Sequence, residues 1–163
     1  LKPVNASKAL MFPRLLPEAQ LGRELRTYVD TLREIDARSG AKYCGIHMAD
    51  LAYPSSAVAD DMFVTQKEPG TLSAVKEPVT LSLFPSRNRR HALINASHPS
   101  VKQLARLHAS QPGLAAYLTL KTLHLHDGKI PADQQSQYTN LAEKMEAQLL
   151  KAALKLDQAR RPA

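Results

Sequence analysis

The last third of the chain has the residue pattern that most limits the possible fold. Three prolines, Pro99, Pro112 and Pro131, each stand in front of a segment rich in apolar residues. Proline suits the first turn of a helix, where the backbone N–H that it lacks would have no partner. The apolar residues behind each proline recur mostly at spacings of three and four, which places them along one side of a helix. The pattern therefore predicts three consecutive C-terminal helices that form a bundle.

A further helix is predicted near the N-terminus. Five apolar residues recur at heptad spacing between Pro17 and Arg38, and Gly40 follows as a helix-ending residue. These five are Leu21, Leu25, Tyr28, Leu32 and Ile35. The repeat covers barely two heptads, so we expect a helix packed on a sheet rather than a coiled coil.

Short strands are predicted between the N-terminal helix and the C-terminal helices. Residues 43–48 form a short apolar run, residues 79–84 alternate apolar and polar side chains, and residues 91–94 are again apolar. Residues 85–89 join the last two strands as a hairpin loop, whereas residues 49–78 show no clear pattern. The expected fold class is α+β, with an N-terminal helix, a small, largely antiparallel three-stranded sheet and a C-terminal three-helix bundle.

The length of 163 residues suits one domain with short tails. We expect an extended lead-in over residues 1–16, a single α+β dimerisation or interaction domain over residues 17–158, and a basic tail over residues 159–163. The chain begins at Leu1 and has no signal-peptide pattern, so we expect it to be a piece of a longer protein.

The corner between the last predicted strand and the first C-terminal helix has a distinctive sequence, Asn95-Ala96-Ser97-His98-Pro99. We expect the Asn95 side chain to bond nearby backbone and His98 to cap the helix that Pro99 begins, so that both hold the corner. This Asn-x-x-His-Pro corner and the three helices after it, from Leu93 to Lys151, resemble the C-terminal dimerisation domain of the HtpG-type, ninety-kilodalton heat-shock chaperones. The resemblance implies a dimer made by the final helices, client proteins as further partners, and a parent ATPase whose ATP-binding domain lies upstream.

The last predicted helix carries more apolar surface than one neighbour can cover. One stripe contains Leu141, Met145 and Leu149, and Leu150 and Leu154 lie beside it. Two adjacent apolar faces indicate packing on its own domain and on something else. We therefore predict a two-fold homodimer with these five residues in the interface.

No cluster of residues predicts a reaction. Cys44 and His47 are three apart on a predicted strand and face opposite sides, and His124 and His126 are two apart on a helix and cannot share one ion. Asp60 and Asp61 are neighbouring acidic residues, a pattern typical of a solvated turn. No phosphate-binding glycine motif occurs in the sequence. We therefore expect no enzyme activity, no catalytic residues, no metal and no cofactor in this chain.

The net charge of +7 leaves one alternative function open. Arg87, Arg89 and Arg90 form the densest basic group and could contact a nucleic acid or another polyanion. Only 5% of the residues are aromatic, so few side chains could stack on bases, and we do not expect nucleic acid to be the main partner. No run of about 18 apolar residues occurs, and the single Cys44 fits a reducing compartment. We expect a cytoplasmic protein without membrane contact.

Overall fold

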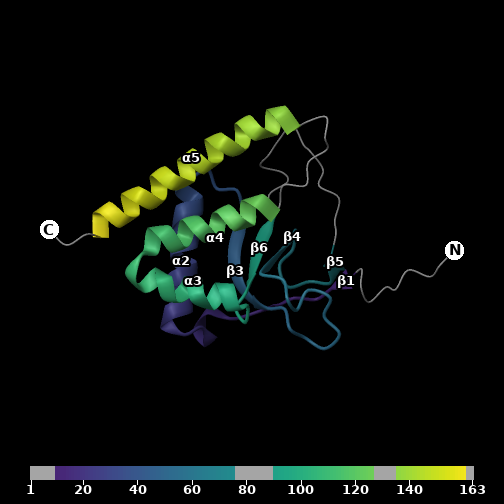
Figure 1. Ribbon diagram of the computed structural model, residues 1–163. Coiled ribbons are helices and arrows are strands. Elements are labelled where there is room, and N and C mark those ends of the chain that lie inside the picture. The colour runs from purple at the N-terminus through teal and green to yellow at the C-terminus, as the bar shows by residue number, and fades with distance from the viewer. Residues whose placement is uncertain (1–9, 76–89, 127–134, 161–163) are drawn as a thin grey trace. The chain divides into compact units, whose positions relative to one another are not determined.

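The computed structural model describes residues 10–75, 90–126 and 135–160, and at residues 125–126, 135–146 and 160 it describes the backbone alone (Figure 1). The fold is mixed α+β, which confirms the predicted class. The chain divides into two compact units. The sheet unit comprises Leu1–Gly22 and Tyr43–Lys102, and the helical unit comprises Arg23–Lys42 and Gln103–Ala163. The single domain expected over residues 17–158 stays a prediction.

The main sheet of the sheet unit has four strands in the order β2-β3-β6-β4. They are β2 (Arg14–Leu15), β3 (Gly45–Asp50), β6 (His91–Asn95) and β4 (Phe63–Gln66). The central strands β3 and β6 are parallel, and β2 and β4 pair antiparallel on either side. A second sheet pairs β1 (Leu10–Met11) with β5 (Ser73–Ala74) antiparallel.

The predicted three-stranded layout is not confirmed, because the described main sheet has four strands; its two outer pairings are antiparallel and its central pairing is parallel. The apolar runs at 43–48 and 91–94 do correspond to β3 and β6, but these two strands are parallel to each other. Strands β1, β2 and β5 are two residues long, too short to show an alternation. The strand expected at 79–84 and its hairpin loop lie outside the described residues.

The central strands bury side chains on both faces of the main sheet. On one face, Ala49, Val64 and Leu93 belong to a buried apolar cluster. The remaining buried members of this cluster are Met11, Leu51 and Val58. On the other face, Ile46, Met48, Ala92 and Ile94 are almost completely buried. Parallel strands are usually apolar on both faces, which explains why β3 and β6 read as continuous apolar runs rather than as alternating ones.

The helical unit contains the helices that the apolar spacings predicted. They are α2 (Arg23–Arg38), the second half of α3 (Pro99–Ser110), α4 (Pro112–His126) and α5 (Gln135–Arg160). The predicted start of α2 at Pro17 was six residues early, because only a short 3-10 turn, η1 (Glu18–Gln20), forms there. The helix ends as predicted before Gly40, which has a φ of +114°.

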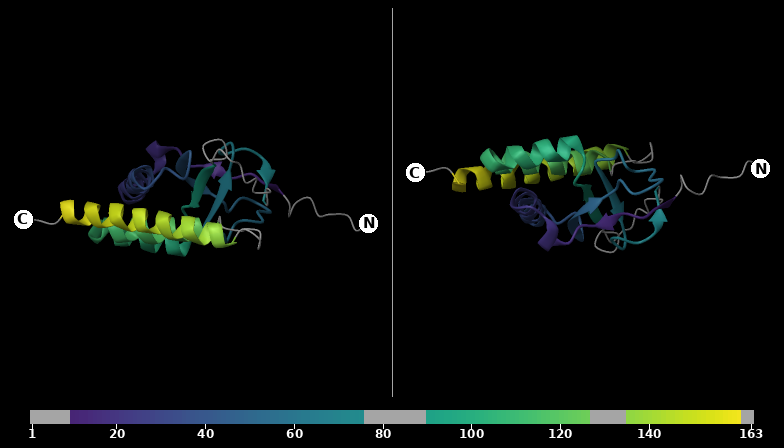
Figure 2. Two further views of the ribbon diagram at one scale, coloured as in Figure 1. Left: turned by 90° about the horizontal axis from the view of Figure 1, so that it is seen from above. Right: turned by 90° about the horizontal axis from the view of Figure 1, so that it is seen from below.

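The helices of this unit pack differently from the predicted bundle. Helices α4 and α5 run side by side, as Figure 2 shows, and α2 packs against both of them. The three-helix bundle of C-terminal helices is therefore not confirmed, since the N-terminal helix supplies the third member of this packing. Its buried residues Tyr28, Leu32 and Ile35 come from the predicted apolar stripe.

Buried hydroxyl groups fix α2 against α4. Tyr28 Oη lies 2.5 Å from Thr119 Oγ1 in α4. Because the Thr119 hydroxyl donates its one proton to the carbonyl of Ala115, Tyr28 is the donor in this bond. Burial raises the pKa of Tyr28 well above its ordinary value, an effect that the bond to Thr119 reduces only in part. The tyrosine therefore stays neutral and its hydroxyl remains a donor.

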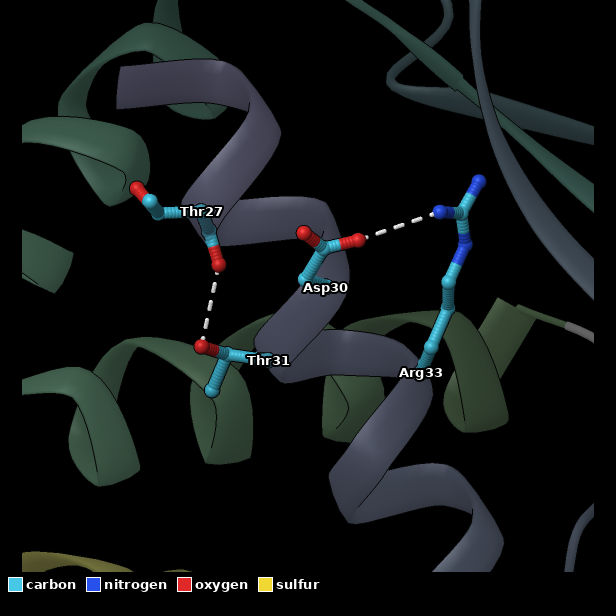
Figure 3. A network of polar contacts seen from close by, with 4 residues as sticks. All are labelled: Thr27, Asp30, Thr31 and Arg33. Carbon is cyan, nitrogen blue, oxygen red and sulfur yellow. Dashed lines mark hydrogen bonds and ion pairs between the residues drawn. The ribbon is translucent and has the colours of Figure 1, made fainter. Parts of the chain in front are cut away.

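A second polar contact joins α2 to α3. Thr31 Oγ1 lies 3.0 Å from the carbonyl oxygen of Thr27, one turn earlier in α2 (Figure 3). Thr31 Oγ1 also lies 2.6 Å from Nε2 of the buried His108 in α3. On the solvent side of the helix, Asp30 and Arg33 form an ion pair of 3.2 Å that is open to water and contributes little to stability.

Candidate functional site

The predicted dimer interface on α5 divides into buried and exposed residues. Leu149 has an exposed fraction of 0%, so it belongs to the core of its own unit. A side chain that its own unit already covers offers little surface to a second protomer, so the place of Leu149 in the interface stays a prediction that its burial does not support. Leu150 and Leu154, one turn apart on α5, are 42% and 52% exposed and are available to a partner. The side chains of Leu141 and Met145 lie outside the described residues.

Helix α4 adds a second pair of exposed leucines that the sequence had not singled out. Leu114 and Leu118, also one turn apart, are 38% and 39% exposed. Among the described side chains of the helical unit, these two and the pair on α5 are the exposed large apolar residues. We call the four of them the exposed leucines.

Helices α4 and α5 run antiparallel because the start of one meets the end of the other. The Asp157 carboxylate on α5 accepts a hydrogen bond of 2.8 Å from the backbone N–H of Gly113 in α4. A carboxylate at this position satisfies one of the free N–H groups at a helix start and opposes the positive end of the helix dipole. A side-chain Cβ on Gly113 would lie 2.4 Å from the carbonyl oxygen of Ala153, so this close approach requires glycine.

Basic side chains accompany the exposed leucines. Lys151 and Lys155 follow Leu150 and Leu154 directly and are exposed on α5. On α4, Lys121 Nζ lies 3.2 Å from the hydroxyl of Tyr117. The exposed side chains of α4 and α5 therefore include both leucines and lysines, and exposed apolar side chains can mark an interaction surface.

The corner between β6 and α3 is held by a buried amide. The Asn95 Nδ2 group donates to the carbonyl oxygens of Ala59 and Asp61 at 3.0 and 2.9 Å. Its Oδ1 accepts a hydrogen bond of 3.1 Å from the backbone N–H of Ser97. Asn95 itself is 1% exposed, and the three bonds are part-buried. Its side chain therefore ties the corner to the loop before β4.

His98 and Pro99 form the start of α3. Pro99 is the first residue of the helix, and His98 Nδ1 accepts a hydrogen bond of 3.1 Å from the backbone N–H of Ser100. The ring thus satisfies one of the free donors at the helix start, as a capping side chain does. These contacts are structural in kind, and the ring is only half-buried.

The Asn95→Ala variant should lower the free energy of unfolding by about 2 kcal/mol or more. The substitution removes three part-buried hydrogen bonds, so that two carbonyl oxygens and one N–H lose their partner, and each such loss costs about 1 kcal/mol. Urea unfolding followed by circular dichroism measures the change. His98→Ala, which removes one partly exposed cap bond, should cost about 1 kcal/mol. Unchanged stability of both variants together with a loss of partner binding would identify the corner as a binding site instead.

The basic group considered for polyanion binding is described only in part. Arg90 is half-buried, and its guanidinium donates to Thr65 of β4 through Nε at 3.1 Å and through Nη2 at 2.7 Å. This side chain thus links the loop before β6 to the neighbouring strand. Arg87 and Arg89 lie outside the described residues.

The residues considered for catalysis are not assembled into a site. Cys44 is exposed, and the His47 ring bonds to His91, a partner 44 positions away that no local residue pattern indicates. Asp60 and Asp61 are both exposed. His124 is half-buried, and burial together with the charge of Lys42 lowers its pKa to about 4. The His126 side chain is not among those described.

Within residues 10–75, 90–126 and 135–160, no three His, Cys, Asp or Glu side chains gather in a way that could hold a metal ion. In the same ranges, no helix combines the length and the apolar content needed to cross a membrane.

Comparison with known proteins adds no relative. No family model matches the chain, and neither a curated protein nor a solved structure matches it significantly.

Proposed function

We propose that this chain is a protein-interaction module without chemistry of its own that forms a homodimer through the exposed leucines of α4 and α5. The exposure of these four side chains on two adjacent antiparallel helices is the observation that carries the proposal. Burying apolar surface contributes about 25 cal/mol per Å². A two-fold arrangement would let each copy cover the leucines of the other with the same surface.

The resemblance of the corner and the following helices to the HtpG-type dimerisation domain supports the same function. In a parent ATPase of that kind, a dimer of this module would raise the effective concentration of the two ATP-binding domains for each other. Client proteins would then be further partners of the parent protein.

Polyanion binding is the alternative function. The net charge of +7 and the exposed Lys151 and Lys155 favour it. The bonds from Arg90 to Thr65 give that arginine a different role and so weaken the alternative. The dependence of binding on salt concentration distinguishes the two functions. Binding to phosphates weakens steeply as the ionic strength rises, whereas dimerisation through an apolar interface does not.

The mass of the protein in solution tests the dimer. Light scattering at tens of micromolar protein should give twice the 18.0 kDa mass of one chain, at low and at high salt. The double variant Leu150→Glu/Leu154→Glu should give the monomer mass, because it places charges in the apolar contact. Its circular dichroism should stay that of the folded protein, since both leucines are exposed in the monomer.

Leu72→Glu is the matched control for this double variant. Leu72 is 62% exposed but belongs to the sheet unit, so the same chemical change there should leave the dimer mass unchanged. A wild-type monomer at these concentrations would refute the homodimer. Submicromolar binding to a DNA or RNA duplex, with a steep salt dependence, would then favour the polyanion function.

A further inference from the structure

Two histidines meet on one face of the main sheet. His47 lies on β3 and His91 on the neighbouring parallel strand β6. His47 Nε2 and His91 Nδ1 are 3.0 Å apart, and the ring planes are inclined by 30° with their centroids 5.2 Å apart. Both rings are half-buried, so water and ions can reach them.

Gly45 provides the space in which the two rings meet. It pairs directly with His91 in the β3–β6 register, and it precedes His47 by two residues, so all three positions share one face. A Cβ at position 45 would lie 2.9 Å from both His47 Nε2 and His91 Nδ1. The two facing nitrogens therefore converge above the Cα of the glycine.

The backbone around this pair is held firmly. The parallel register extends over five residue pairs, from Gly45 and His91 to Ala49 and Asn95. Gln66, which pairs with His91 from the other side, is fully buried and has its amide engaged by the turn that follows β4. The two imidazoles are thus presented by central strands of the sheet rather than by a loop.

We propose that His47 and His91 bind a divalent first-row transition-metal ion such as Zn²⁺, Ni²⁺ or Cu²⁺. Imidazole nitrogens lie about 2.0–2.1 Å from such an ion, so two of them at a tetrahedral angle are about 3.3 Å apart. The observed 3.0 Å requires only a small opening of the pair. In the metal-free pair one of the two facing nitrogens carries the proton of the hydrogen bond. When the ion binds, the ring that donated this proton must carry it on its second nitrogen instead, so that both facing nitrogens are free to bind the metal.

The expected ion follows from the donor atoms. Imidazole suits Cu²⁺, Ni²⁺ and Zn²⁺, whereas Mg²⁺ and Ca²⁺ prefer oxygen ligands. Since the described residues contain no third His, Cys, Asp or Glu close enough, water or a small molecule would fill the other positions. The site lies in the sheet unit and does not depend on the exposed leucines of the helical unit.

Calorimetric titration of the untagged, chelator-treated protein with ZnCl₂ and NiCl₂ tests the site. We expect one ion per chain with each salt, because imidazole nitrogens suit both ions. His47→Ala, His91→Ala and Gly45→Ala should each weaken binding by roughly tenfold or more. MgCl₂ should give no heat of binding. Binding should also weaken at lower pH, because protons compete for the ligand nitrogens.

A control variant and a spectroscopic titration test whether His47 and His91 are the ligands. Cys44→Ser removes the nearby exposed thiol and should leave the affinity unchanged. In the wild-type protein, the imidazole nitrogen resonances of His47 and His91 should shift with one equivalent of Zn²⁺, which needs no variant to fold. No binding by the wild type, or binding that only Cys44→Ser abolishes, would overturn the proposal. Binding that survives all three site variants would do so as well.

Discussion

The Leu149→Glu variant should lose the structure of its helical unit rather than its dimer alone. Leu149 is completely buried, so its replacement places a carboxylate in an apolar core without a partner. The free energy of unfolding should fall by more than about 4 kcal/mol, beyond the usual range of single substitutions. Urea unfolding followed by far-ultraviolet circular dichroism measures this loss.

Leu150→Glu is the neighbouring control. Leu150 is 42% exposed on the same helix, so the same change there should shift stability by less than about 1 kcal/mol at concentrations where the protein is a monomer. A folded, stable Leu149→Glu protein that has lost only its dimer would contradict this assignment. It would instead support the original prediction that Leu149 lies in the interface.

The Gly113→Ala variant should separate the start of α4 from the end of α5. The added Cβ would lie 2.4 Å from the carbonyl oxygen of Ala153 and 2.6 Å from Cγ of Asp157, and the first of these is backbone that cannot turn aside. The helices must move apart, which also weakens the bond from the Gly113 N–H to Asp157. We expect a loss of about 2–4 kcal/mol in unfolding free energy, despite the better helix propensity of alanine.

Gly22→Ala serves as the control for Gly113→Ala. Nothing lies within 4 Å of a Cβ built at Gly22, so the same substitution should be neutral or slightly stabilising there. Thermal melting of both variants under the same conditions compares them. Equal melting temperatures would show that α4 and α5 do not approach as closely as described.

The helices could be predicted from the sequence because their signals are local. The stripe from Leu25 to Ile35 and the prolines at 99 and 112 correctly indicated α2, α3 and α4. The first turn of α2 was misplaced because Pro17 is followed by a separate short 3-10 turn. Periodicity alone also left open which apolar face of α5 is the core, so Leu149 and Leu150 could not be distinguished before the packing against α2 and α4 was known.

The sheet and the histidine pair depend on contacts between distant residues. His47 and His91 are 44 positions apart, and only the parallel register of β3 and β6 places their rings together. Within β3, Gly45 stands two residues before His47 and leaves room beside the His47 ring. This spacing does not by itself predict that a second imidazole fills that room. The strand β4 lies in a stretch without a recognisable pattern, because its four residues alternate too briefly.

The arrangement of α2 with α4 has a consequence for the newly made chain. Thr119, which accepts the buried bond from Tyr28, follows it by 91 positions. At about 5–20 residues per second, translation makes α4 roughly 5–20 seconds after α2. During that interval the apolar side of α2 has no packing partner from α4 or α5. A nascent chain at this stage carries α2 without two of the helices that it packs against, and it is then open to aggregation until the C-terminal helices emerge.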